Sequence, residues 1–385
     1  MAEHHPSPPN IITELPHDVI FYNILPRLPV KYATSLRCVS KQWNSFLNTR
    51  LFTNMHLDHH QNHHKLLLFS DAKPCTHFRS VHCEALEDGF SDSRSLPFVA
   101  SSSKNITILG SCNGLVCVGV TKEGREDEYY SFMMLWNPLT GEYKRMCGDY
   151  SDAKCYKVTG SASELYYKAS ADDYMVLRVT EDGDAYIYSL KADSWRKLYC
   201  MGDLTRKRTK LVWGASILHN GNIYFIDEGV RRIRSRLSFS VIKFNTKKEK
   251  FTVMETPRFG DVTTDFLNSM VLEKEGKLHL CVTYKRNSTD QLGGKLWRMD
   301  GDVFRRRKVV RYRIPGKFYY LKPLHLMKNG NWVTVCRSGC HVNELDPGRD
   351  FEKSSYATTK KDYKIDFRKK GIYIETLVSP NGKMK

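Results

Sequence analysis

The chain has 385 residues, of which 41% are hydrophobic and 26% are charged, a composition typical of a folded protein with one small and one large domain. Its formal net charge of +18 permits an acidic partner without identifying one, because the basic residues are spread along the chain. No stretch approaches the ~18 apolar residues of a membrane helix, and the N-terminus lacks a secretory pattern. We expect a protein of the cytoplasm and/or nucleus.

The cysteines favour free thiols over disulfides. There are eleven, none in a CxxC pair, and Cys117 and Cys281 alternate with apolar residues in strand-like runs. Such cysteines usually behave as small buried hydrophobic residues, and a disulfide framework is typical of much shorter secreted chains.

Residues 1–11 are rich in proline and histidine and are expected to form a disordered tail. Three short helices are predicted next. Pro16 suits the first turn of the first helix, and Pro26 is expected to end that helix. Pro29 opens the second helix. Ser40 is the expected N-cap of the third, KQWNSFLN. A unit of about 40 residues rarely has a sufficient core of its own, so we expect it to pack against a partner or against the rest of the chain.

Residues 12–57 resemble the F-box along their whole length, through Leu15-Pro16, Ile24-Leu25, Leu28-Pro29 and the run LRCVSKQW. The resemblance implies that this segment binds a Skp-type adaptor, which links it to the cullin and RING subunits of a ubiquitin ligase. Ala33 and Thr34 depart from the family's pattern in the second helix. By the resemblance, the adaptor-binding residues are Leu15, Pro16, Ile24, Leu28, Pro29, Leu36, Val39 and Trp43.

Residues 58–64 belong to the histidine-rich run HLDHHQNHH. Structural zinc sites draw their ligands from two separated pairs on an ordered frame, and no second pair follows in the sequence. A solvated linker is the prediction, with no metal and no cofactor.

Residues 65–380 predict a mainly β domain built from a repeat of about 50 residues, followed by a tail over 381–385. Each unit has an apolar strand, a polar turn and a strand opening with an aromatic residue: Tyr143, Trp195, Phe251, Phe304 and Phe351. This period indicates a kelch-like β-propeller of about six blades, closed by pairing KLLLFS (65–70) with GIYIETLV (371–378). A pair of β-sandwiches is the alternative.

The same region resembles the plant F-box-associated domain, through GSCNGLVCV (110–118), LWNPLTGEYKRM (135–146), DDYMVLRV (172–179) and YIYSLKADSWRKL (186–198). The two resemblances together imply a substrate-recognition subunit of an SCF ubiquitin ligase. Such a subunit recruits a target protein for ubiquitination and degradation and is not itself an enzyme.

The target is expected on a propeller face, where loops lie on a rigid frame. No common enzyme motif is present, although a propeller enzyme with a site in its central channel stays an alternative. A basic protein that binds nucleic acid or acidic partners without a ubiquitin role is another, less favoured because the basic runs match no nucleic-acid motif. The candidate target-binding residues lie in two basic runs: Arg231, Arg232, Arg234, Arg236, Arg305, Arg306 and Arg307.

Overall fold

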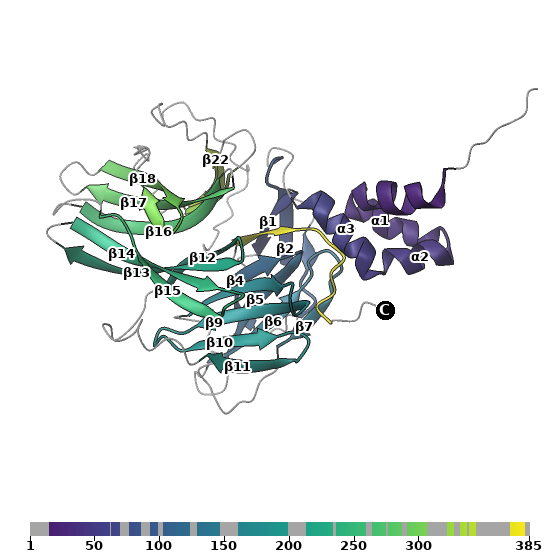
Figure 1. Ribbon diagram of the computed structural model, residues 1–385, viewed down its shortest axis with the longest axis horizontal. Coiled ribbons are helices and arrows are strands. Elements are labelled where there is room, and N and C mark those ends of the chain that lie inside the picture. Colours follow the sequence, from purple (N-terminus) through teal and green to yellow (C-terminus); the bar gives the residue numbers. More distant parts are fainter. Residues whose placement is uncertain are drawn as a thin grey trace, which may run out of the picture. The chain divides into compact units, whose positions relative to one another are not determined.

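The structure is a computed structural model in which the chain divides into a unit ending at Asn62 and a unit over His63–Lys383 (Figure 1). The structure describes residues 15–61, 63–69, 77–85, 93–98, 103–123, 129–146, 161–198, 213–233, 236–258, 264–274, 276–286, 291–305, 322–326, 332–336, 339–343 and 370–381.

The first unit is helical. Pro29 is the N-cap of its second predicted helix, and the Ser40 hydroxyl accepts a hydrogen bond of 3.1 Å from the Trp43 amide, so both predicted starts are confirmed. The helices are η1 (Val19–Ile24), η2 (Leu25–Arg27), α1 (Val30–Ser35), η3 (Leu36–Cys38), α2 (Lys41–Leu47) and α3 (Arg50–His60).

Pro26 does not stop the first helix at once. It lies inside the single 3-10 turn η2, and the helix ends when Leu28 becomes extended, with φ −70° and ψ 142°. A proline is tolerated in a first turn because its missing amide hydrogen is not needed there.

Helix α3 corrects the prediction of a linker over residues 58–64, since it continues through His60. Thr49 caps it by accepting a hydrogen bond of 3.2 Å from the Phe52 amide. Phe52, His56 and His60 recur every four residues and all three are buried, so the histidines form the inner face of a helix.

Replacing Ser40 with alanine should weaken α2 by about 1 kcal/mol, because the Trp43 amide loses its cap. Hydrogen exchange of the amides in residues 41–47 measures this local effect without global unfolding. Ser45→Ala, at an exposed position in the same helix, is the control, and equal exchange in both variants would contradict the capping role.

The second unit consists of antiparallel sheets. Five have four strands: the first blade (β23 Lys370–Ile374, β1 His64–Phe69, β2 His77–His82, β3 Arg94–Ser95), the second (β4 Ser103–Cys112, β5 Leu115–Glu123, β6 Tyr129–Trp136, β7 Tyr143–Arg145), the third (β8 Ala162–Lys168, β9 Asp173–Val179, β10 Ala185–Ser189, β11 Ser194–Leu198), the fourth (β12 Trp213–His219, β13 Asn222–Ile233, β14 Arg236–Asn245, β15 Lys250–Glu255) and the fifth (β16 Thr264–Lys274, β17 Lys277–Arg286, β18 Gln291–Asp300, β19 Val303–Arg305).

The blade count corrects the prediction of about six. The structure has five four-stranded blades, while a further sheet has three strands in the described residues: β20 (Lys322–Leu326), β21 (Trp332–Cys336) and β22 (Gly339–Asn343). The predicted outer-strand aromatic of this repeat, Phe351, lies outside the described residues. The inner strands contact one another in the order β23, β4, β8, β12, β16, β20 and again β23, which is a propeller and not a pair of sandwiches.

The first blade joins the two ends of the domain. Strand β1 pairs with β2 on one side and with β23 on the other, where Leu66 lies opposite Ile372. The predicted pairing of residues 65–70 with residues 371–378 is therefore confirmed within the described part of these segments.

The repeated aromatic residues open the outer strands. Each lies opposite a large apolar residue at the end of the preceding strand, which makes a cross-strand pair of the kind that stabilises sheets. The pairs are Tyr143 with Trp136, Trp195 with Tyr188, Phe251 with Phe244 and Phe304 with Met299.

The hydrophobic core lies between neighbouring blades. In β13, Ile223 and Phe225 pack toward the third blade, while Tyr224 and Ile226 pack toward the fifth. Successive side chains of a strand point to opposite faces, so each blade is covered only when both neighbours are present. This burial is the physical reason for the ring.

The residues after β23 form a strap over the second blade. Thr376, Leu377, Val378 and Pro380 are buried, and Val378 packs in the cluster shared by the second and third blades. Gly114, at φ +85°, leaves the room the strap needs, because a Cβ there would lie 2.1 Å from the Thr376 Oγ1 atom.

Cys83, Cys117 and Cys281 are buried thiols, and Cys38 is exposed. None of the helices among the described residues combines the length and apolar character needed to cross a membrane.

Candidate functional site

The helical unit has a small aromatic core. Phe21 packs edge-on against Phe46, with ring centroids 4.7 Å apart, and Phe46 packs against Phe52 at 5.6 Å. Ala33, at a position where the family pattern has a larger residue, is fully buried. Its small side chain therefore affects packing inside the unit and not its surface.

Apolar side chains are also concentrated on the surface of this unit. Of the nine large hydrophobic residues in the described chain that are more than a third exposed, six lie in residues 15–51. A short helical unit with this much exposed apolar surface has the character of one half of an interface. The six are Leu15, Tyr22, Ile24, Tyr32, Val39 and Leu51.

None of the eight predicted adaptor-binding residues belongs to the buried core. Leu15, Pro16, Ile24, Pro29 and Val39 are exposed, while Leu28, Leu36 and Trp43 are half-buried. Trp43 also touches the core, since its ring lies edge-on to Phe21 at 5.9 Å.

Three exposed apolar residues on this surface were not predicted: Tyr22, Tyr32 and Leu51. All three lie outside the short motifs that carry the resemblance. The signal that could have found them is their position opposite the buried positions of each helix.

His56 joins helix α3 to the break before α1, and His60 contacts His56 within the same helix. The His56 Nε2 atom lies 3.0 Å from the Leu28 carbonyl oxygen, and the His60 Nδ1 atom lies 2.9 Å from the His56 carbonyl oxygen. Their rings stack with centroids 4.1 Å apart. No group of three or more metal-binding side chains is present among the described residues.

The predicted target-binding arginines lie in two places. Arg231 and Arg232 belong to β13, Arg236 begins β14, and Arg305 ends β19. Arg234, Arg306 and Arg307 lie outside the described residues. The arginines of β13 and β14 lie near the hairpin that joins these two strands, where Ile233 pairs with Arg236. The Asn220–Gly221 turn lies at the other end of β13.

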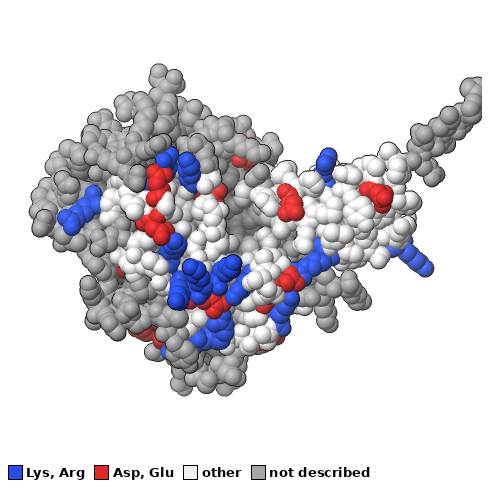
Figure 2. All heavy atoms as spheres, viewed as in Figure 1, with Lys and Arg blue, Asp and Glu red and all other residues white. Residues whose placement is uncertain are grey.

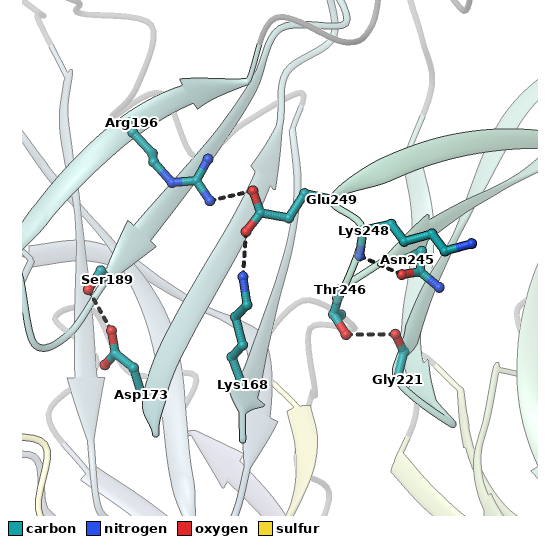
Figure 3. A network of polar contacts seen from close by, with 9 residues as sticks. All are labelled: Lys168, Asp173, Ser189, Arg196, Gly221, Asn245, Thr246, Lys248 and Glu249. Carbon is teal, nitrogen blue, oxygen red and sulfur yellow. Dashed lines mark hydrogen bonds and ion pairs between the residues drawn. The ribbon is translucent and has the colours of Figure 1, made fainter. Parts of the chain in front are cut away.

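A second basic surface, which the sequence analysis missed, lies where the third and fourth blades meet. The Glu249 carboxylate accepts hydrogen bonds from the Lys168 Nζ atom at 2.7 Å and the Arg196 Nη2 atom at 2.6 Å (Figure 3). Partial burial acts to raise the pKa of Glu249, but the hydrogen bonds from Lys168 and Arg196 outweigh it and hold this pKa below its usual value.

The turn before β15 is anchored on the neighbouring turn. The Thr246 hydroxyl donates to the Gly221 carbonyl at 2.7 Å, and the Asn245 side chain accepts from the Lys248 amide at 2.7 Å (Figure 3). Figure 2 shows lysine and arginine side chains gathered in the part of the view where Figure 1 draws β9, β10 and β15.

Buried ionisable groups in the blades are structural in character. Burial raises the pKa of Glu164 to about 7, although hydrogen bonds from Ser216 and from the Leu165 amide act against it. Burial also raises the pKa of Cys112 to about 12 and raises the pKa of Cys117. Thiols in this state are poor nucleophiles, since the thiolate is the reactive form.

Comparison with known protein families agrees with both units. The chain matches the F-box domain over residues 12–54 and the F-box associated beta propeller domain over residues 61–311. The second match covers more than half of the chain.

Two relatives from Arabidopsis thaliana match along much of their length. The F-box protein ETP1 is 27% identical over 73% of this chain and 72% of its own, and the F-box/kelch-repeat protein At3g23880 is 22% identical over 97% of both. Among solved structures, a puromycin-hydrolyzing peptidase of Mycobacterium tuberculosis is 10% identical, with a TM-score of 0.40, over 65% of this chain and 38% of its own.

Proposed function

The chain belongs to the plant F-box proteins that carry an F-box-associated β-propeller domain, and we propose on that basis that it is the substrate-recognition subunit of an SCF ubiquitin ligase. In this proposal residues 12–57 bind a Skp-type adaptor, and through it the cullin and RING subunits. The propeller, over residues 65–380, holds a target protein. The protein acts in the cytoplasm and/or nucleus.

The observation that supports adaptor binding is the exposed apolar surface of the helical unit. Leu15, Ile24 and Val39 are each more than a third exposed, although residues of this kind are usually buried. An adaptor that covers them removes apolar surface from water, which is the main favourable term in most associations. The half-buried Leu28, Leu36 and Trp43 then line the same interface.

The chain itself contributes no bond-making step in this proposal. Its effect is to tether the target near a charged ubiquitin carrier, which raises the effective concentration of the target's lysines. The basic arginines Arg231, Arg232, Arg234, Arg236, Arg305, Arg306 and Arg307 are candidate target contacts.

Val39→Glu should weaken adaptor binding more than about tenfold, because a buried carboxylate without a partner is costly in an apolar interface. Val39 is a better position for this test than Leu28, whose carbonyl holds His56, or Pro29, which caps α1. The measurement is calorimetric titration of the full chain with a purified plant Skp-type adaptor.

Asn54→Glu is the control, because Asn54 is exposed in α3 and belongs neither to the predicted contacts nor to the exposed apolar residues of this surface. It should bind the adaptor as wild type does. Unchanged binding by the Val39 variant, or absence of binding by the wild type to every adaptor, would argue against the proposal.

A further inference from the structure

The Glu249 site is the group formed by Lys168, Arg196, Lys247, Lys248, Glu249 and Lys250. It is assembled from the end of β8, from β11 and from the turn before β15. The site already holds one carboxylate, with an ammonium on one oxygen at 2.7 Å and a guanidinium on the other at 2.6 Å (Figure 3). Two cations converging on both oxygens is the arrangement by which proteins recognise carboxylates.

The charge of the site is not balanced internally. It has five cationic side chains and one carboxylate, which gives a local excess of four positive charges. Lys247, Lys248 and Lys250 are exposed, and no ion pair is found for them among the described residues. The neighbouring acidic residues already have partners: Asp172 pairs with Lys191, and Asp173 accepts from the Ser189 hydroxyl at 2.5 Å.

The contact with Arg196 is the exposed side of the Glu249 carboxylate. The Arg196 side chain is 50% exposed, while those of Glu249 and Lys168 are 19% and 21% exposed. An ion pair with so exposed a partner contributes little, because water and salt compete with it. The residue also has a φ of +52°, in the left-handed region that is uncommon for residues other than glycine.

We propose that the Glu249 site binds an acidic segment of the target protein, with an aspartate or glutamate carboxylate taking the place of Glu249 between Lys168 and Arg196. The three lysines of the turn hold the flanking acidic residues. This inference rests on the proposed function, because it assumes that the propeller holds a protein target.

An acidic protein segment fits the site better than nucleic acid. Proteins that bind single strands combine positive charge with exposed aromatic residues on which bases stack. Among the described residues of the propeller, one large aromatic side chain is more than a third exposed. It belongs to Tyr143, on the second blade, so the Glu249 site offers no exposed aromatic ring for a base to stack on.

The first test measures binding of a labelled oligoglutamate peptide to the full chain by fluorescence anisotropy. Lys247→Glu/Lys248→Glu should weaken binding at least about fivefold, since it replaces attraction by repulsion at two positions. Arg258→Glu/Lys277→Glu is the matched control, because it makes the same change in net charge at exposed positions elsewhere on the propeller. Equal weakening by both variants would show attraction to net charge alone and overturn the proposal.

The second test addresses displacement. Glu249→Gln should strengthen peptide binding severalfold, because Lys168 and Arg196 are then free of the internal carboxylate. Thermal unfolding of the same sample shows that the variant is folded. A folded Glu249→Gln variant with unchanged or weaker peptide binding overturns the displacement.

Two competing ligands complete the design. A phosphoserine peptide of the same length, or single-stranded RNA, that binds more tightly than oligoglutamate and is sensitive to the same lysines would overturn the assignment to carboxylates. The adaptor titration is independent of these measurements. Adaptor binding without peptide binding contradicts only this inference, and peptide binding without adaptor binding contradicts only the proposed function.

Discussion

Replacing Asn137 with alanine should lower the free energy of unfolding of the propeller by about 3–5 kcal/mol. Asn137 is fully buried, and its Nδ2 atom donates to the carbonyls of Thr376 at 2.9 Å and Val378 at 2.8 Å. Its Oδ1 atom accepts from the Leu139 amide at 2.8 Å. Alanine leaves these buried groups without partners and releases the strap from the second blade.

Urea unfolding of the full chain, followed by tryptophan fluorescence, measures the effect, and hydrogen exchange of residues 370–381 locates it. Asn381→Ala is the control, because Asn381 lies exposed at the end of the same strap. It should change stability by less than about 0.5 kcal/mol. If the Asn137 variant kept the stability of the wild type, the strap would not be held as the structure describes.

Replacing Glu164 with glutamine should make the propeller more stable at neutral and higher pH, by up to about 3 kcal/mol. Burial raises the pKa of Glu164 from 4.5 to about 7, so the folded chain binds this proton more tightly than the unfolded chain does. Between these two pKa values the folded state holds more protons, and wild-type stability therefore falls as the pH rises through this window. Glutamine is neutral at every pH and does not carry this cost.

The test compares urea unfolding at about pH 5 and about pH 8, on either side of most of the titration. The Glu164 variant should lose less stability between the two pH values than the wild type does. Glu142→Gln, at an exposed position, should leave the difference unchanged. A parallel pH dependence in the wild type and the Glu164 variant would show that this carboxyl titrates normally.

Apart from the pairing of β1 with β23, which followed from the strands left over at the two ends of the repeat, the features that could be predicted from the sequence are local ones. Ser40 caps α2 through an amide three residues away, and Asn113-Gly114 and Asn220-Gly221 form tight turns with positive φ within a hairpin. Residue type at a few neighbouring positions decides such structures. The outer-strand aromatics were found for the same reason, since a repeat shows the same local choice several times.

The features that were missed join distant parts of the chain. Lys168 and Glu249 are 81 residues apart, and Asn137 and Thr376 are 239 residues apart. Neither pair carries a signal in sequence, because a lysine, glutamate or asparagine at a turn is usually solvated. The buried face of α3 was missed because a histidine-rich run has the composition of a polar, solvated segment. In the structure, His56 and His60 of this run are buried inside the helical unit.

The first blade has a consequence for the order of synthesis. Residue His64 of β1 pairs with Ile374 of β23, so the blade lacks one strand until residue 374 has left the ribosome. At the usual rates of translation, roughly 15–60 s pass between the synthesis of β1 and that of β23, and during this time one edge of β1 is unpaired. An unpaired edge is a template for aggregation, so we expect chaperones to bind the nascent propeller there. The helices of residues 19–60 precede every strand of the propeller in the chain, so a stalled or prematurely ended chain would carry the whole F-box segment on an open propeller.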